Sequence, residues 1–312
     1  MSPGTEAGAG AGRKRPPVHP GPKHALILGL SALVIFLAAS TWLAFYPGVP
    51  SDLGGARDLD RRARRVDIPV GSGERLDGWY LPGSRGATVM FFHGYGRDHT
   101  RAWRYAQFLQ RAGYGVLTAD FRSSRAAGRK PTTLGYYELE DARAMLDWLE
   151  HASPARRDRV ALLGESLGGS VALVLAAERP EVAAVVADCP FASGERALED
   201  SFERWVHVPR WPITPIAGAL ASGLTGHDPR ALDALAAARR LRDRPLFLIA
   251  ARHDDRFGPS QSEDLWRAAG ARDSLWLLED GGHNEAWLRH RAEYERRVLA
   301  FYARALAEAR AP

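Results

Sequence analysis

Short apolar runs alternate with stretches of helical periodicity along most of the chain. The runs fall at residues 87–92, 115–119, 160–163, 182–187, 246–250 and 275–278. Runs that are apolar throughout are typical of strands buried on both faces, as in a parallel sheet. Helices are predicted between and after them, at 100–112, 136–151, 167–179, 261–269 and 291–309. This alternation predicts an α/β fold with a mostly parallel central sheet and helices on both faces.

Two further segments frame this pattern. Residues 64–70 and 75–81 alternate apolar and polar positions around Gly71-Ser72-Gly73, which predicts a β-hairpin. Residues 191–236 interrupt the alternation with Trp205, Trp211 and a cluster of prolines at Pro209, Pro212 and Pro215. We interpret this interruption as a small inserted lid, and an irregular covering loop is the alternative. The domain is therefore expected over 64–312, with the lid at about 191–236.

The N-terminal part has a different pattern. Residues 25–46 are 22 positions without a charge, which as a helix would span roughly 30 Å of hydrocarbon. We predict a transmembrane signal anchor here, preceded by a disordered basic N-terminus at 1–24 and followed by a linker at 47–63. The alternative is a cleaved signal peptide, but the apolar region is longer than the usual ~7–15 residues.

The expected location is a bacterial inner membrane, crossed once. Lysine and arginine residues lie on both sides of the apolar segment, so the positive-inside rule leaves open which side holds the domain. The net charge of +5 comes from scattered arginines that usually lie beside acids, so no nucleic-acid partner is expected. The single cysteine, Cys189, excludes an internal disulfide and a cysteine-based zinc site.

One serine lies between glycines where a predicted strand meets a predicted helix. The segment is Gly164-Glu165-Ser166-Leu167-Gly168. A residue on such a turn adopts a strained backbone, and its side chain projects from the carboxyl edge of the sheet. The N-terminus of the following helix adds backbone N–H donors and a partial positive charge. These features predict a nucleophile at Ser166, with a simple helix-capping serine as the alternative.

A serine nucleophile needs a base, and the base needs an acid. His283 lies in a loop after the last predicted strand, and Asp254 and Asp255 follow the preceding strand. The order serine, acid, histidine is the one expected when all three follow successive strands. Backbone N–H groups of Tyr95 and Leu167 are predicted to form an oxyanion hole, while His93 is expected to order the loop around Tyr95.

These residues resemble the α/β-hydrolase superfamily, over about Arg64 to Arg310. Its membrane-anchored Bem46-like or ABHD13-like serine hydrolases are most similar. The resemblance rests on the following segments in this order: "RLDGWYLP", "FFHGYG", "LTADFRSS", "GYYELEDARAMLDWL", "LLGESLGG", "HDDRFGP" and "GGHNEAW". The family's acid stands four residues before a proline, which selects Asp255, with Asp254 second. Asp188 is third, because some hydrolases place the acid after the strand that follows the nucleophile.

Two positions depart from the family pattern. Arg252 replaces a usual glycine, and the segment Asp120-Phe121-Arg122-Ser123-Ser124 lacks the glycines that normally follow the arginine. Both departures affect loops around the pocket, so they bear on substrate shape more than on the triad. Glu138, Glu140 and Asp141 fit the family pattern, and a structural role is expected for them.

The resemblance and the residues together imply a serine hydrolase with an α/β-hydrolase fold. It would cleave an ester, thioester or related acyl bond through a Ser166–His283–Asp255 triad and an acyl-enzyme. An apolar acyl substrate and the lipid bilayer are the expected partners, and no cofactor or metal is expected. The alternatives are a serine peptidase and a membrane-tethered, non-catalytic binding module on the same fold.

Overall fold

The computed structural model describes residues 21–48, 59, 61–71, 73–124, 130–151, 159–207, 209–270 and 275–308. Residues 1–20 of the predicted basic N-terminus and most of the predicted linker lie outside these residues. Residues 22–24, which were predicted to be disordered, begin a helix instead. The chain divides into two units, Met1–Ala39 and Ser40–Pro312.

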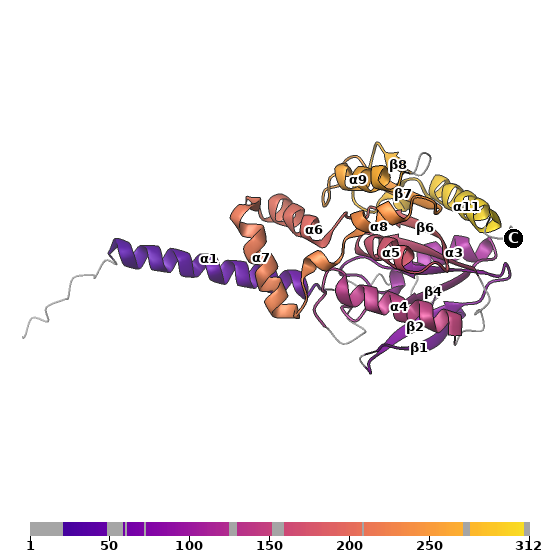
Figure 1. Cartoon of the computed structure of the whole chain (residues 1–312), viewed down its shortest axis with the longest axis horizontal. Helices are drawn as coiled ribbons and strands as arrows, with labels where there is room; N and C mark the ends of the chain where they lie inside the picture. The colour runs from indigo at the N-terminus through magenta and orange to yellow at the C-terminus, as the bar shows by residue number, and fades with distance from the viewer. Residues whose placement is uncertain are drawn as a thin grey trace, which may run out of the picture. The chain divides into compact units, whose positions relative to one another are not determined.

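Most of the predicted strands are present with nearly the expected bounds (Figure 1). The strands are β1 (Arg64–Pro69), β2 (Arg75–Leu81), β3 (Ala87–Phe92), β4 (Gly115–Ala119), β5 (Arg159–Glu165), β6 (Val182–Asp188), β7 (Leu246–Ala251) and β8 (Leu275–Leu278). The α-helices are α1 (Pro22–Phe45), α3 (Trp103–Arg111), α4 (Tyr136–His151), α5 (Leu167–Glu178), α6 (Gly194–Ser201), α7 (Arg210–Thr225), α8 (Ala234–Arg240), α9 (Pro259–Ala269), α10 (Ala286–Arg289) and α11 (Arg291–Glu308). Shorter helical turns are η1 (His99–Ala102), η2 (Phe202–Val206) and η3 (Pro229–Ala231).

The strands form one eight-stranded sheet in the order β1-β2-β4-β3-β5-β6-β7-β8. The hairpin strands β1 and β2 pair antiparallel to each other, and β2 pairs antiparallel to β4. Every other pair in this sheet is parallel. The mostly parallel sheet predicted from the apolar runs is confirmed. Because parallel strands end at a common edge, the loops after β3, β5, β7 and β8 lie on the same side of the domain.

Two apolar cores lie on the two faces of the sheet. On one face α4, α5, α8 and α9 contribute residues such as Met145, Val171 and Leu265. On the other face α3 and α11 contribute residues such as Phe108 and Tyr302. Successive strand residues supply both cores, since side chains alternate across a strand. This arrangement explains why the strands read as continuous apolar runs.

The segment predicted as a lid is helical rather than irregular. Between β6 and β7 the chain forms α6, η2, α7 and η3 before α8 returns to the sheet. Figure 1 shows α6 and α7 away from the sheet layers. Sequence patterns missed α7 because Pro209, Pro212, Pro215 and a kink at Trp211 break its helical period, and they missed α6 because its eight residues are too few to show one.

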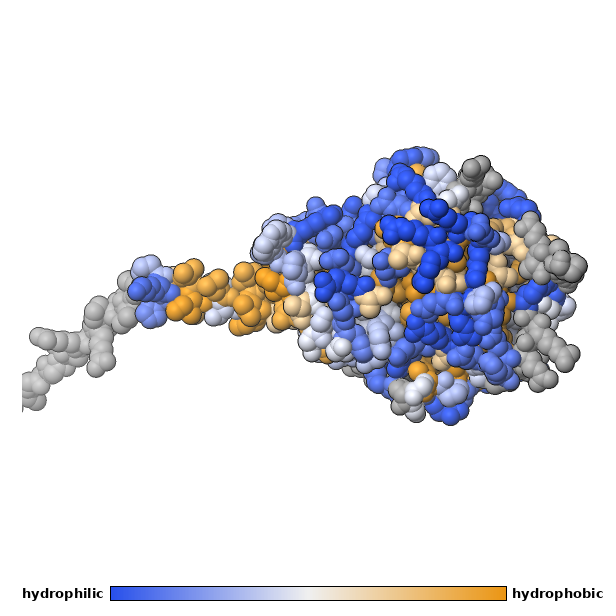
Figure 2. Space-filling model, in the orientation of Figure 1, coloured by the Kyte–Doolittle hydropathy of each residue, from blue (hydrophilic) through white to orange (hydrophobic). Residues whose placement is uncertain are grey.

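Helix α1 contains 24 residues and is long and apolar enough to cross a membrane. Figure 2 shows hydrophobic residues over most of this helix, whereas the visible face of the sheet domain is mainly hydrophilic. The helix continues into the second unit, since Ser40–Phe45 belong to its last turns.

Candidate active site

Ser166 lies on a sharp turn between β5 and α5. Its backbone has φ 53° and ψ −119°, a conformation that is strained for a residue with a side chain. The turn is tight because its glycines touch other backbone atoms. A Cβ on Gly164 would lie 2.2 Å from the carbonyl oxygen of Gly168, and one on Gly168 would lie 2.2 Å from that of Phe92. No residue other than glycine fits at either position.

A chain of hydrogen bonds joins Ser166 to an acid through His283. The Nε2 atom of His283 is 2.9 Å from Ser166 Oγ, and its Nδ1 atom is 2.7 Å from Asp254 Oδ2. The other carboxylate oxygen of Asp254 accepts hydrogen bonds from the backbone N–H groups of Arg256 (2.8 Å) and Phe257 (2.9 Å). These contacts fix both ends of the histidine ring.

The acid that is hydrogen-bonded to His283 is Asp254. The sequence-based prediction of Asp255 at this position was wrong. Asp254 is buried, whereas Asp255 is exposed on the next position of the turn. The reason is local: the side chain of Asp254 closes a turn onto the N–H groups two and three residues ahead, which directs its second oxygen toward His283. The spacing to the proline is one residue longer here than the family pattern assumes.

The charge of Asp254 suits this position. Burial would raise its pKa, but the hydrogen bond and charge of His283, with the two backbone donors, lower it overall. The ionised carboxylate favours a proton on Nδ1 of His283, which leaves Nε2 to accept the proton of Ser166.

The predicted oxyanion residues flank the serine. The carbonyl of Gly94 accepts a 3.2 Å hydrogen bond from Arg97 N–H, closing a turn with Tyr95 and Gly96 at its centre. A Cβ on Gly94 would lie 3.3 Å from that of Ser166, so the turn packs directly on the nucleophile. Leu167 is the first residue of α5. Within the described ranges, the N–H groups of Tyr95 and Leu167 donate to no other residue.

His93 holds the loop that carries Tyr95. Its Nδ1 lies 3.0 Å from the carbonyl oxygen of Gly94, and its Nε2 accepts a 3.1 Å hydrogen bond from Phe121 N–H. The ring is buried, and burial lowers its pKa, so it is neutral with both nitrogens engaged. His93 therefore orders the loop, as the sequence predicted.

Buried acids lie behind the nucleophile. Glu165 accepts hydrogen bonds from Arg101 Nε (2.8 Å) and from the Tyr105 hydroxyl. The backbone carbonyl of Asp188 accepts from Ser166 N–H at 2.8 Å, while its carboxyl oxygens have no hydrogen-bond partner among the described residues. Burial, with the nearby charge of Glu165, raises the pKa of Asp188 to about 7. Asp188, the third candidate acid, is thus not bonded to His283.

One group of side chains has the atoms to surround a metal ion. Among the described residues, Cys189, Asp254 and His283 bring their ligand atoms within 4.8 Å of one another. Burial raises the pKa of Cys189 well above its ordinary value, whereas a metal needs the thiolate. Asp254 and His283 are already bonded to each other. In this arrangement the three residues do not fit a metal ion.

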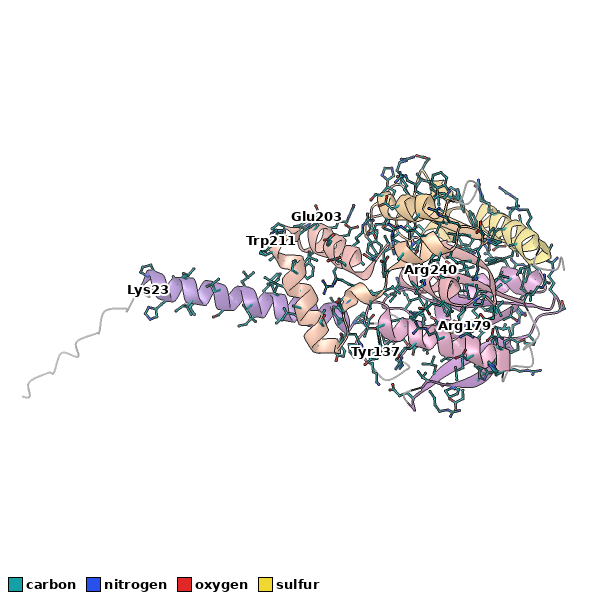
Figure 3. The ribbon with its side chains drawn as sticks, in the orientation of Figure 1. Lys23, Tyr137, Arg179, Glu203, Trp211 and Arg240 are labelled. Carbon is teal, nitrogen blue, oxygen red and sulfur yellow. The ribbon has the colours of Figure 1, made fainter. Side chains whose placement is uncertain are left out.

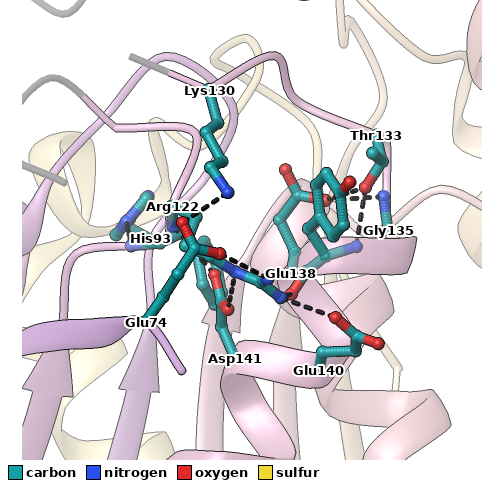
Figure 4. Close-up of polar contacts among 11 residues, drawn as sticks. Glu74, His93, Arg122, Lys130, Thr133, Gly135, Glu138, Glu140 and Asp141 are labelled. Carbon is teal, nitrogen blue, oxygen red and sulfur yellow. Dashed lines mark hydrogen bonds and ion pairs between the residues drawn. The ribbon is translucent and has the colours of Figure 1, made fainter. Parts of the chain in front are cut away.

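A buried arginine, Arg122, anchors the loop after β4 that lacks the usual glycines (Figure 4). Arg122 donates to Asp141 through Nε (2.6 Å) and its backbone N–H (2.8 Å), and to Glu140 through Nη2 (2.7 Å). Glu138 accepts from Thr133 and Gly135 near the start of α4. These contacts tie α4 to the loop whose Phe121 N–H holds His93. They agree with the structural role expected for the three acids.

Two cavities meet at Ser166. One, of about 400 Å³, is lined by polar groups that include Arg97, Arg101 and His283. The other, of about 370 Å³, is mainly apolar and is lined in part by Phe191 and Leu198 of the lid region. Both also include residues of the α1 C-terminus. Sequence reasoning missed this contribution, because it treated the apolar helix as a separate anchor.

A family model and several known proteins match most of this chain. A family model described as X-Pro dipeptidyl-peptidase (S15 family) matches residues 79–307, which contain Ser166, Asp254 and His283. MT2364, an uncharacterized protein of Mycobacterium tuberculosis, is 31% identical over 71% of this chain and 73% of its own length. The α/β hydrolase domain-containing protein WAV2 of Arabidopsis thaliana is 24% identical over 88% of this chain and 90% of its own.

One solved structure is similar to this chain over nearly the whole length of the solved protein. The esterase Pf2001 of Pyrococcus furiosus has a TM-score of 0.65 and 25% identity, covering 83% of this chain and 97% of that one. The closer resemblance to Bem46-like members stays a prediction.

Proposed function

We propose that this chain cleaves an ester, thioester or related acyl bond through an acyl-enzyme at Ser166. The chain belongs to the family described as X-Pro dipeptidyl-peptidase (S15 family), within the α/β-hydrolase superfamily, and is a hydrolase. The observation that carries the proposal is the hydrogen-bonded chain from Ser166 through His283 to Asp254. This chain has the geometry that converts an alcohol into a nucleophile.

The proposed reaction has two halves. Ser166 Oγ attacks the carbonyl carbon while His283 Nε2 takes its proton, and Asp254 stabilises the resulting imidazolium. The N–H groups of Tyr95 and Leu167 stabilise the oxyanion, an effect of about 3–4 kcal/mol per donor in comparable sites. His283 then protonates the leaving group and activates a water molecule that hydrolyses the acyl-enzyme.

A membrane setting is supported by two apolar surfaces. Helix α1 is long and apolar enough to cross a bilayer. Helix α7 of the lid exposes large apolar side chains to solvent: Trp211 (76% exposed), Ile216 (43%), Leu220 (36%) and Leu224 (39%). Figure 3 shows Trp211 projecting from α7. Exposed apolar stripes of this kind are typical of helices that lie in a membrane interface. We therefore place the reaction at a membrane surface.

Peptidase activity is the second candidate, because the matching family model describes a peptidase. Release of a dipeptide from a free N-terminus requires a site for an ammonium group. The polar cavity is lined by three arginines and one carboxylate, Glu165, which already accepts from Arg101. This positive lining favours an anionic group over an ammonium group. We therefore rank the ester above the dipeptide as substrate.

Active-site labelling tests the proposal. A fluorophosphonate probe is expected to label the purified full-length chain and the Ser260→Ala control, whose serine lies exposed on α9. Ser166→Ala is expected to abolish labelling. Labelling of Ser166→Ala at the wild-type level would contradict the assignment, and absence of labelling in the wild type would favour a non-catalytic binding module. Turnover of p-nitrophenyl butyrate and of an X-Pro p-nitroanilide then separates esterase from peptidase.

A further inference from the structure

The apolar cavity beside Ser166 has walls from parts of the chain that are far apart in sequence. One wall is the last turns of α1, and the other is the lid segment from α6 to η2. The lining residues that define these walls are Ser40, Leu43, Ala44, Ala197, Leu198 and Phe202. All of them belong to the second unit of the chain. The end of the apolar helix is thus part of the site.

The α1 C-terminus is fixed to the catalytic loops. The last carbonyl groups of a helix lack partners within it and must find donors elsewhere. Here the Tyr95 hydroxyl donates to the carbonyl of Ala44 at 2.6 Å, and Thr132 N–H donates to that of Phe45 at 2.8 Å. The side chain of Phe45 is itself buried. This wall of the cavity is therefore held by the same turn that carries a proposed oxyanion donor.

The size and lining of this cavity suit one hydrocarbon chain. Its volume is about 370 Å³. At ~30 Å³ for a group the size of a water molecule, that is room for a chain of about ten carbons, with longer chains extending through the mouth. Burying each methylene group would tighten binding about fourfold, so affinity is expected to rise with chain length until the cavity is filled.

The polar cavity suits an anionic group. Arg97, Arg101 and Arg256 line it, and Arg256 lines the apolar cavity as well. Glu165 is the one acid among its lining residues, and it is bonded to Arg101; a guanidinium has five N–H donors, so it can keep a protein partner and still donate to an anion. Guanidinium groups bind phosphate oxygens with paired hydrogen bonds. The two cavities meet at Ser166, where an ester joining a chain to a head group would be cleaved.

We propose that the substrate is a single-chain membrane lipid, an acyl ester of a phosphate-bearing alcohol. Its acyl chain lies between the α1 C-terminus and the lid, and its head group lies among the three arginines. The bilayer is the source, because one wall of the chain pocket is the end of a helix long enough to span it. This inference rests on the proposed function, since it requires an acyl-enzyme at Ser166.

The reaction balances as a hydrolysis. The ester C–O bond breaks as the Ser166 Oγ–acyl bond forms, and the alkoxide of the head group leaves with the proton from His283. Water then supplies the hydroxyl of the free fatty acid and returns the proton to Ser166. The products are one fatty acid and one phosphate-bearing alcohol.

Chain-length selectivity tests the apolar subsite. The full-length chain in detergent is assayed with p-nitrophenyl esters from acetate to dodecanoate. Ser40→Phe, which adds bulk to the pocket wall, is expected to lower the dodecanoate-to-acetate ratio of kcat/KM at least about tenfold. The control is Ser31→Phe, the same change at an exposed position of the same helix. Leu43→Ala, which widens the mouth, is expected to move the optimum to longer chains. Unchanged ratios in both pocket variants would overturn the proposal.

Head-group selectivity tests the polar subsite. Vesicles carry either a monoacyl glycerophosphate or the uncharged monoacylglycerol with the same chain. The wild type is expected to prefer the phosphate ester, and Arg97→Gln is expected to reduce that preference at least about fivefold. Arg240→Gln, an exposed arginine at the end of α8, is the control (Figure 3). Equal rates on both lipids, or faster cleavage of soluble acyl-coenzyme A, would overturn the assignment.

Failure of this inference is distinguishable from failure of the proposed function. Fluorophosphonate labelling at Ser166 and hydrolysis of short esters report the acyl-enzyme alone. If labelling and short-ester hydrolysis persist but neither selectivity changes in the variants, the esterase assignment is supported and the lipid substrate is contradicted. If the wild type shows neither labelling nor short-ester hydrolysis, the esterase assignment and the lipid substrate are both contradicted.

Discussion

The hydroxyl of Tyr95 donates a 2.6 Å hydrogen bond to the carbonyl oxygen of Ala44. Tyr95 belongs to the turn beside Ser166, and Ala44 belongs to the last turn of α1. Burial raises the pKa of this hydroxyl to about 12, so it remains a donor throughout the ordinary pH range. The end of the apolar helix and the turn that carries a proposed oxyanion donor are thereby linked through one side chain.

Removing this hydroxyl tests the link. Tyr95→Phe keeps the backbone N–H but leaves the Ala44 carbonyl without its donor, which is expected to cost about 1 kcal/mol of stability. We also expect a severalfold lower kcat on long-chain esters, because the turn is less well held. Steady-state kinetics and thermal unfolding in detergent measure both effects. The control is Tyr46→Phe, whose ring stacks on Trp42 nearby. Equal effects of the two changes would contradict the link.

The identity of the acid is tested by two neighbouring substitutions. Asp254→Asn removes the carboxylate bonded to His283 and favours the wrong tautomer, so kcat is expected to fall about 10³–10⁴-fold. Asp255→Asn changes an exposed side chain and is expected to change kcat less than about twofold. Hydrolysis of p-nitrophenyl butyrate measures both. If Asp255→Asn lowered kcat more than Asp254→Asn, Asp255 would be the acid that orients His283.

Asp188 predicts a pH dependence of stability. Its pKa is about 7 in the folded chain, raised by burial from 3.8. The folded state therefore holds an extra proton between these values, and the stability it provides is complete below about pH 4 and lost as the pH rises through 7. Asp188→Asn mimics the protonated form. Its advantage over the wild type in denaturant unfolding is expected to be about 2 kcal/mol larger at pH 8 than at pH 5.

The control for this prediction is Asp77→Asn in β2, whose carboxylate is half exposed. That change is expected to give the same small difference at both pH values. An advantage of Asp188→Asn that does not grow with pH would show that Asp188 is ionised in the folded chain throughout this range.

The Arg122 anchor is tested by breaking and then rebalancing it. Its guanidinium is 3% exposed and bonds to the fully buried carboxylate of Asp141. Arg122→Gln leaves that carboxylate without its charged partner and is expected to cost about 3–5 kcal/mol. The double variant Arg122→Gln/Asp141→Asn is expected to recover part of this loss, because no buried charge remains. Additive losses in denaturant unfolding would contradict coupling between the two side chains.

The apolar stripe of α7 predicts a dependence on the membrane. Ile216→Glu combined with Leu220→Glu places two charges on this exposed face. We expect the ratio of vesicle-lipid hydrolysis to soluble-ester hydrolysis to fall at least about tenfold. Leu288→Glu, at another exposed leucine on α10, is the matched control. If the ratio in the double variant equals that of the wild type, α7 does not contribute to membrane contact.

The strands and most sheet helices could be predicted because one physical signal dominated each of them. Strands β3 to β7 are buried on both faces and the edge strand β8 is partly buried, so continuous apolar runs marked all six within a residue or two. The lid helices gave no such signal. Helix α7 carries exposed apolar residues and prolines that obscure its amphipathic period, and α6 has only eight residues, which is shorter than the window over which a helical period can be recognised.

The site could be predicted where backbone geometry restricts the residue type. The elbow at Ser166 needs glycines at Gly164 and Gly168, and these appear in the sequence. The choice between Asp254 and Asp255 depended on which carboxylate the turn directs inward. Two adjacent aspartates look equivalent until the N–H groups of Arg256 and Phe257 select one. The contribution of Leu43 to the site had no sequence signal, because it depends on long-range packing.

The attachment of Ala44 and Phe45 to Tyr95 and Thr132 has a practical consequence for producing this enzyme. Cutting away the apolar helix to obtain a water-soluble fragment would also delete the residues of that helix that line the apolar cavity beside Ser166. Such a fragment would still react with small esters. Its preference for acyl-chain length, however, would be that of a cavity with one wall missing and would differ from that of the intact polypeptide. Screening for the natural substrate therefore calls for the intact polypeptide in a lipid nanodisc.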